Sequence, residues 1–148
     1  MKLKSPLAAA LLAASLALGL TACGGGGDSG SSVVVANPAA FTKTDTVTGP
    51  STGAQAVTGK TVTVTYTGWL YSATAVDHKG TQFDSGNYTF TIGTKAVVDG
   101  FDQGVLGMKV GGKRTVLIPS SMGYGSSGKG SIPPNAGLVF DIALTKVQ

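Results

Sequence analysis

Few residues of this chain could act as a nucleophile, a general base or a metal ligand. Its 148 residues include one cysteine, one histidine and seven acidic residues, all of them aspartate. A single cysteine and a single histidine exclude a Cys/His zinc site. The histidine, His78, lies in a polar segment without a serine or cysteine nucleophile motif, and we expect it to face solvent. Any enzymatic activity of this chain therefore needs no metal, no cofactor and no strong base.

Aromatic side chains form the second group that could build a site, and most of them fall on inward positions of predicted strands: Tyr66, Phe83, Tyr88, Phe90, Phe101, Tyr124 and Phe140. We interpret Phe90 as core filling. A buried phenol needs a hydrogen-bond partner, so Tyr66 and Tyr124 indicate a site rather than simple packing. An apolar pocket with a few converging polar groups is the usual form of a ligand-binding site.

The elements that must position these aromatics are mainly strands. Two-residue alternation predicts strands at residues 61–67, 88–92, 114–119 and 138–147, and an edge strand at about 41–48. Between Gly93 and Gly112 the apolar spacing changes to about 3.6 residues, which predicts one short helix. Gly100, Gly104 and Gly107 keep that helix short and allow it to approach a sheet closely. The predicted class is α+β, an antiparallel sheet whose apolar face wraps one helix.

The N-terminus has the features of an export signal. Lys2 and Lys4 precede an uncharged apolar stretch from Pro6 to Leu20, which is shorter than the roughly 20 residues of a membrane span. Residues 20–23 (LTAC) resemble the lipobox of bacterial lipoproteins, which implies that residues 1–22 are a signal peptide and that Cys23 is lipidated. An ordinary signal peptide cleaved nearby, leaving a free thiol, is the alternative.

Removal of the signal peptide changes the charge and defines the domains. Without Lys2 and Lys4, nine basic residues face seven acidic ones, so the net charge falls from +4 to +2. A charge this small forms no basic patch, and we expect no nucleic-acid partner. Residues 24–32 are a Gly/Ser linker. We assign residues 23–40 to the lipidated cysteine and its tether, and residues 41–148 to the folded domain.

Five runs of sequence resemble FKBP-type peptidyl-prolyl cis-trans isomerases and follow the order of that family: Val64–Leu70 (VTYTGWL), Phe83–Ser85 (FDS), Gly104–Arg114, Met122–Gly125 (MGYG) and Ile132–Asp141 (IPPNAGLVFD). The resemblance extends from about Phe41 to the last residue. It implies a five-stranded, strongly twisted antiparallel sheet wrapped around one short helix. It also implies isomerase activity on X–Pro bonds without a cofactor or a metal.

The resemblance assigns roles to individual residues. Tyr66 matches the aromatic wall whose hydroxyl meets Asp84, Phe101 matches a pocket floor that is most often tryptophan, and Tyr124 matches the donor to a ligand carbonyl. The catalytic residues implied are Tyr66, Asp84, Phe101, Tyr124 and Phe140. The substrate-binding residues implied are Phe83, Tyr88, Val97, Val98 and Ile132. Two segments depart from the family pattern: residues 84–90 are shorter than usual, and the loop at residues 72–79 is longer.

Two functions remain open from the sequence. The first is a membrane-tethered isomerase that helps exported proteins fold. The second is a weakly active or inactive envelope module that binds proline peptides or acts like a chaperone. Both imply proline-containing polypeptides as partners and the macrolide inhibitors of the family as candidate ligands. We expect a monomer that is lipid-anchored in the bacterial envelope and faces the periplasm. Gly24 replaces the aspartate that retains enteric-type lipoproteins at the inner membrane, which favours the outer membrane.

Overall fold

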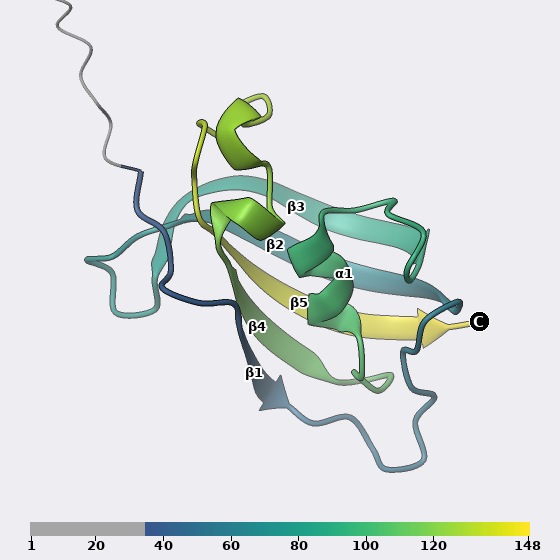
Figure 1. Ribbon diagram of the computed structural model, residues 1–148. Coiled ribbons are helices and arrows are strands. Elements are labelled where there is room, and N and C mark those ends of the chain that lie inside the picture. The colour runs from purple at the N-terminus through teal and green to yellow at the C-terminus, as the bar shows by residue number, and fades with distance from the viewer. Residues whose placement is uncertain (1–34) are drawn as a thin grey trace, which may run out of the picture. The chain divides into compact units, whose positions relative to one another are not determined.

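The computed structural model describes residues 35–148 (Figure 1). The predicted signal peptide, Cys23 and most of the predicted tether lie outside these residues. The elements follow in the order β1 (Thr42–Val47), β2 (Thr61–Tyr71), β3 (Lys79–Thr91), α1 (Asp99–Val105), β4 (Lys113–Ile118), two short 3-10 helices η1 (Ser120–Met122) and η2 (Gly125–Ser127), and β5 (Leu138–Val147). None of the described helices is long and apolar enough to cross a membrane.

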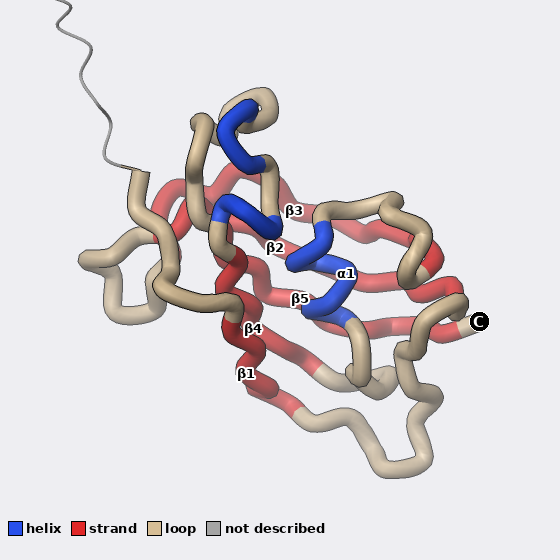
Figure 2. The backbone as a smooth tube through the Cα atoms, in the orientation of Figure 1, coloured by secondary structure: helices blue, strands red, loops and turns tan. Residues whose placement is uncertain are grey.

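The five strands form one sheet in the order β1-β4-β5-β2-β3, and every neighbouring pair is antiparallel. Helix α1 lies across one face of the sheet, against β4 and β5 (Figure 2). The predicted α+β fold, a five-stranded antiparallel sheet around one short helix, is confirmed. β3 begins nine residues before the strand predicted at Tyr88. The prediction missed these residues because most of them are exposed on both faces of the strand and show no hydrophobic alternation.

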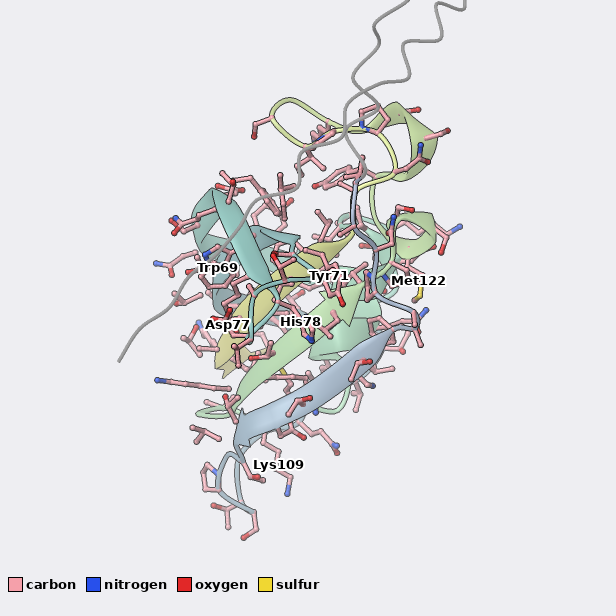
Figure 3. The ribbon with its side chains drawn as sticks, turned by 90° about the vertical axis from the view of Figure 1, so that its left-hand side faces the viewer. Trp69, Tyr71, Asp77, His78, Lys109 and Met122 are labelled. Atoms are coloured by element: carbon pink, nitrogen blue, oxygen red, sulfur yellow. The ribbon has the colours of Figure 1, made fainter. Side chains whose placement is uncertain are left out.

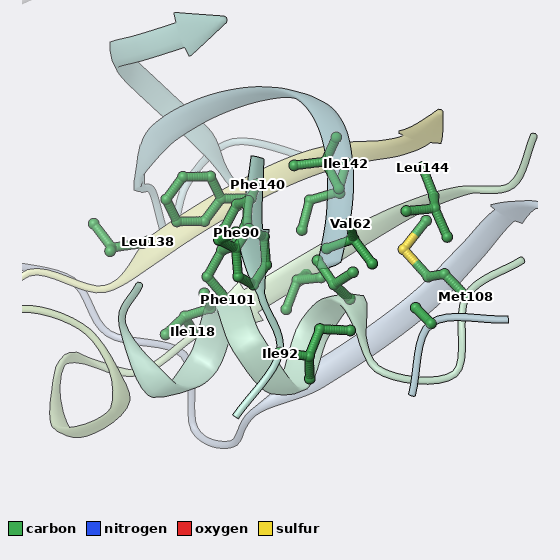
Figure 4. Close-up of a cluster of buried hydrophobic side chains, with 14 of the residues drawn as sticks. Val62, Phe90, Ile92, Phe101, Met108, Ile118, Leu138, Phe140, Ile142 and Leu144 are labelled. Carbon is green, nitrogen blue, oxygen red and sulfur yellow. The ribbon is translucent and has the colours of Figure 1, made fainter. Parts of the chain in front are cut away.

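The core lies between the sheet and α1. Val62 and Val64 of β2 are fully buried, as the alternation predicts. They meet apolar side chains from the helix, the other strands and the loops, among them Phe90, Ile92, Phe101, Val105, Met108, Val116, Ile118, Leu138, Phe140, Ile142 and Leu144 (Figure 4). The aromatic members gather at one end of this cluster, where the core continues into the cavity described below.

Two glycines allow α1 to lie directly on β4. A Cβ atom at Gly104 would stand 3.0 Å from Cγ2 of Val116, and a Cβ atom at Gly100 would overlap the side chain of Ile118. Since Gly100 and Gly104 are four residues apart, they share one helix face, and that face rests on the strand without side chains of its own. The sequence-based expectation of close approach agrees with this geometry for Gly100 and Gly104. Gly107 lies beyond the end of α1, where φ is +86°, and does not face the sheet.

Gly100→Ala is expected to destabilise the domain by about 1–3 kcal/mol, the usual cost of overpacking a filled core. In an exposed helix the same change would stabilise by up to about 1 kcal/mol, because alanine has the higher helix propensity. The sign of the change in unfolding free energy therefore reports whether α1 packs directly against β4. Chemical denaturation of Gly100→Ala, Ile118→Ala and the double variant measures it. Gly100→Ala should cost less in the Ile118→Ala background, because alanine lacks the Cγ2 atom that the new methyl group would overlap. An unchanged or raised stability of Gly100→Ala would contradict the packing.

Arg114 of β4 connects three parts of the fold and is only 8% exposed. Its Nε and Nη2 atoms donate to the two carboxylate oxygens of Asp45 on β1, at 2.6 and 3.2 Å. Its Nη1 atom donates to the carbonyl oxygens of Gly104 and Leu106, at 2.8 and 3.0 Å, where α1 ends. The hydrogen bond from Arg114 lowers the pKa of Asp45 below its usual 3.8. Edge strand, central strand and helix end are thus joined through one guanidinium group.

The chain ahead of β1 is fastened to the connection between β4 and β5. The carbonyl of Ala36 accepts from the N–H of Gly137 at 3.1 Å. The Asn37 side chain accepts from the N–H of Ser120 at 2.8 Å and donates to the carbonyl of Asn135. These contacts hold both ends of the β4–β5 connection. Residues 35–40, which the sequence analysis placed in the tether, therefore pack with the domain.

Candidate active site

A cavity of about 230 Å³ opens at the aromatic end of the core. Strands β2, β3 and β5, helix α1 with the residues just before it, and the β4–β5 connection each contribute to its wall. The lining residues are Tyr66, Phe83, Asp84, Tyr88, Ala96, Val97, Val98, Phe101, Tyr124, Lys129 and Phe140. The volume is below the roughly 300–1,000 Å³ of sites for drug-sized ligands, and it suits a single small ring. Within residues 35–148, no three His, Cys, Asp or Glu side chains lie together as metal ligands.

Edge-to-face aromatic contacts shape the cavity. The Phe101 ring meets the rings of Phe140 and Tyr66 with centroids 5.0 and 5.7 Å apart, at interplanar angles of 83° in both cases. Phe83 meets Phe140 in the same way at 5.6 Å. A Cβ atom at Gly68 would come within 2.7 Å of both the Phe83 and the Phe140 ring, so only glycine leaves room for these two walls. Such pairs favour edge-to-face orientations, and they form the apolar part of the cavity wall.

One hydrogen bond crosses the polar side of the cavity. β2 and β3 pair with Tyr66 opposite Gly86 and Gly68 opposite Asp84, which brings the Tyr66 and Asp84 side chains together. The Tyr66 hydroxyl donates to Oδ2 of Asp84 at 2.6 Å, and Oδ1 of Asp84 accepts from the N–H of Ser85 at 2.9 Å. Burial, followed by the hydrogen bond to Asp84, raises the pKa of Tyr66 to about 12. The phenol therefore stays protonated at neutral pH and serves as an oriented donor.

The Tyr66 phenol is expected to ionise near pH 12, well above the usual value of 10. Because its pKa is raised on folding, its contribution to stability is complete below pH 10 and is lost as the pH rises from 10 through about 12. The difference in ultraviolet absorbance between wild type and Tyr66→Phe during alkaline titration isolates this phenol. Circular dichroism at each pH shows whether the chain is still folded. A difference curve centred near pH 10 in folded protein would contradict the partly buried, hydrogen-bonded geometry.

The structure brings nearly all of the predicted site residues to one cavity. All five assigned a catalytic role, together with Phe83, Tyr88, Val97 and Val98, line it, although Tyr88 is 43% exposed and stands at the rim. Ile132 does not line the cavity: its side chain is buried in the hydrophobic core at 6% exposure. The backbone explains this position, since Ile132 closes a tight turn with Lys129 through two hydrogen bonds of 2.9 and 3.0 Å.

Three further residues differ from what the sequence suggests. Ala96 and Lys129 line the cavity and were not predicted, because neither a small side chain ahead of a helix nor a lysine in a Gly/Ser-rich loop carries a recognisable signal. The expectation that His78 faces solvent is wrong in part. The His78 ring is only partly exposed and stacks on Tyr71, with ring centroids 5.0 Å apart (Figure 3). Neither residue lines the cavity. It is a structural residue of the loop between β2 and β3.

Known proteins resemble this chain in sequence and in structure. The family model for FKBP-type peptidyl-prolyl cis-trans isomerases matches residues 52–145. An FK506-binding protein of Neisseria meningitidis serogroup B is 48% identical over 101 residues, which cover 64% of this chain and 86% of that protein. FK506-binding protein 1B of Neurospora crassa is 46% identical over 102 residues, which cover 66% and 90% respectively. The crystal structure of AtFKBP13 matches with a TM-score of 0.61 and 33% identity, over 76% of this chain and 96% of that one.

Proposed function

The chain belongs to the family of FKBP-type peptidyl-prolyl cis-trans isomerases, and from this premise we propose that it rotates X–Pro bonds of exported proteins inside its aromatic cavity. The observation that carries the mechanism is the cavity itself. It is walled by Tyr66, Phe83, Phe101 and Phe140, and its volume suits a prolyl ring. We further propose that FK506-type macrolides, after which several relatives are named, compete for this cavity.

The barrier to X–Pro rotation is about 18–20 kcal/mol, because the planar amide must lose its resonance. A planar amide is strongly polar and well hydrated, whereas the twisted amide is less polar. An apolar cavity that removes water therefore favours the twisted state over both planar isomers, and that difference is the catalysis. No covalent bond is made or broken, so neither a nucleophile nor a general base is needed.

The polar groups at the wall would hold the twisted amide in place. Tyr66 is oriented by its 2.6 Å hydrogen bond to Asp84. Asp84 is exposed and already accepts from both Tyr66 and Ser85, so its role in this mechanism is orientation and electrostatics, not proton transfer. Tyr124 lies in the β4–β5 connection, and its hydroxyl would donate a hydrogen bond to a substrate carbonyl.

A protease-coupled assay on a proline tetrapeptide, with purified domain and with Asp84→Ala and Tyr124→Phe, tests the mechanism. Each variant should keep measurable activity, with a loss of about 2- to 12-fold, because each removes one hydrogen bond that bears on the amide, worth about 0.5–1.5 kcal/mol, and leaves the apolar walls intact. In Asp84→Ala that bond is the one that orients Tyr66, and the exposed N–H of Ser85 regains water. Abolition by Asp84→Ala alone would indicate acid–base chemistry instead. No acceleration by the wild type at micromolar concentration would favour a module that binds proline segments without isomerising them.

We also propose that the mature protein begins at a lipidated Cys23 and faces the periplasm as a monomer. The apolar stretch before Cys23, the LTAC run and the Gly/Ser segment after it support this arrangement. Two or more acyl chains hold a protein stably on a bilayer, whereas one chain does so only weakly. Slow X–Pro steps in exported chains would provide substrates in that compartment. Gly24 in place of aspartate supports the outer rather than the inner membrane.

Expression of the full chain and of Cys23→Ser in a bacterial host tests the anchor. The wild type should sediment with membranes, and mass spectrometry of its mature N-terminal peptide should show acyl chains on residue 23. Separation of inner and outer membranes then locates it. Cys23→Ser should lack the acylated peptide. Release of the wild type as a soluble periplasmic protein with an unmodified thiol would support the ordinary signal peptide instead.

A further inference from the structure

Lys129 is the one cation among the residues that line the cavity. It lies in the β4–β5 connection, five residues after Tyr124, and its side chain is exposed. Its Nζ atom stands 5.6 Å from the centroid of the Tyr124 ring, a distance at which the ammonium group is attracted to the ring face. This contact places a positive charge over the ring of the tyrosine whose hydroxyl is proposed to donate to a substrate carbonyl.

The turn that carries Lys129 is fixed by its backbone. The N–H of Lys129 donates to the carbonyl of Ile132 at 3.0 Å, and the N–H of Ile132 donates to the carbonyl of Lys129 at 2.9 Å. The N–H of Gly128 donates to the carbonyl of Tyr124 at 3.2 Å, and the buried Ile132 side chain anchors the turn in the core. Lys129 therefore presents its charge at the cavity from a constrained turn rather than from a free loop end.

No carboxylate of the described residues uses this charge. The ion pairs within residues 35–148 join Lys79 to Asp141 and Arg114 to Asp45, and Lys129 takes part in neither. The other charged group of the lining is Asp84, whose carboxylate accepts from Tyr66 on the β2–β3 side. The cavity mouth thus has a negative group on one element and, among these residues, an unpaired positive group on another.

We propose that Lys129 is a specificity residue that favours X–Pro segments with an acidic side chain next to the proline. This inference rests on the proposed isomerase function and names a substrate class for it. A carboxylate on a residue flanking the bound proline is within reach of a mobile ammonium group at the cavity mouth. Exposed ion pairs of this kind change an equilibrium or a rate by only about 1.5- to 5-fold and weaken in salt. The expected preference is therefore modest, dependent on ionic strength, and specific to Lys129.

The test measures kcat/KM by exchange NMR on acetylated and amidated peptides, in which glutamate or glutamine stands immediately before or after proline. The ratio of the glutamate to the glutamine peptide is compared among wild type, Lys129→Gln and Lys129→Glu at low and high salt. Lys95→Gln is the matched control, because Lys95 is exposed one residue before Ala96 but does not line the cavity.

At low salt the wild type and Lys95→Gln should favour the glutamate peptide by about 2- to 5-fold in at least one of the two positions. Lys129→Gln should bring that ratio close to one, Lys129→Glu should invert it, and high salt should reduce it in the wild type. An equal ratio in wild type and Lys129→Gln, with both peptides turned over, overturns the inference and leaves the isomerase function standing. Failure to accelerate either peptide overturns both.

Discussion

Phe101→Ala is expected to lower kcat/KM by about 10- to 100-fold, the largest loss among single changes at the cavity. The Phe101 ring is 4% exposed, contacts the rings of Tyr66, Phe90 and Phe140, and forms part of the cavity wall. Removing it would admit water beside the amide and leave three neighbouring rings without this contact. Burial of one such ring is worth about 1.5–3 kcal/mol, which corresponds to that range of rates when it acts on the twisted state.

Stability has to be separated from catalysis in this variant, because deleting a buried phenylalanine side chain costs about 3–5 kcal/mol. Phe90→Ala is the matched control. Phe90 is as buried as Phe101, and the centroids of the two rings are 5.8 Å apart, but Phe90 does not line the cavity. Both variants should unfold at lower denaturant concentration, whereas the folded fraction of Phe101→Ala should be much less active. Phe101→Leu keeps most of the side-chain volume, so relative to Phe101→Ala it should recover more of the stability than of the activity. Equal activity losses in Phe101→Ala and Phe90→Ala would contradict a direct role for the Phe101 ring.

Arg114→Met is expected to destabilise the domain by about 3 kcal/mol, the second large effect. The change leaves the buried carbonyl of Gly104 without its donor and removes the ion pair to Asp45. An unpaired buried polar group costs about 1–3 kcal/mol, and loss of one partner of a buried ion pair costs about 3–5 kcal/mol. The total should fall below the sum of these two ranges, since the Asp45 side chain is 49% exposed and regains water. Urea denaturation of the wild type and of Arg114→Met measures the difference in unfolding free energy.

Asp45→Asn is the matched control for Arg114→Met and should cost no more than about 1 kcal/mol at neutral pH, as for other exposed partners of ion pairs. The pKa of Asp45 is lowered below 3.8, so its stabilising contribution is complete above that value and is lost as the pH falls through the folded pKa. The stability difference between wild type and Asp45→Asn should therefore shrink below about pH 4. A difference that stayed constant from pH 7 to pH 2 would show that the carboxylate charge is not what Arg114 binds.

Local patterns in the sequence were enough to predict the fold. Alternation along β2 and β5 identifies their buried faces, because a strand with one face in the core repeats every two residues. The change of period around Phe101 marks the helix, and Gly100 and Gly104 indicate its close packing. The first half of β3 was missed because side chains exposed on both faces carry no such period. Roles for Tyr66, Asp84 and Tyr124 came from family resemblance, since no local pattern reveals that residues so far apart along the chain will meet.

The sequence by itself determined which side chains were available: aromatics and hydroxyls in place of nucleophiles, metal ligands or strong bases. Only the tertiary structure decided where they stand. The turn closed by Lys129 and Ile132 sends the isoleucine into the core and leaves the lysine at the cavity, whereas the family resemblance assigned Ile132 to substrate binding and gave Lys129 no role. Arg114 reaches the end of α1 only after β4 and the helix have packed together. The physical reason is the same in both cases: a periodic pattern records the burial of a face, whereas non-periodic contacts depend on turns and distances that exist only in the folded chain.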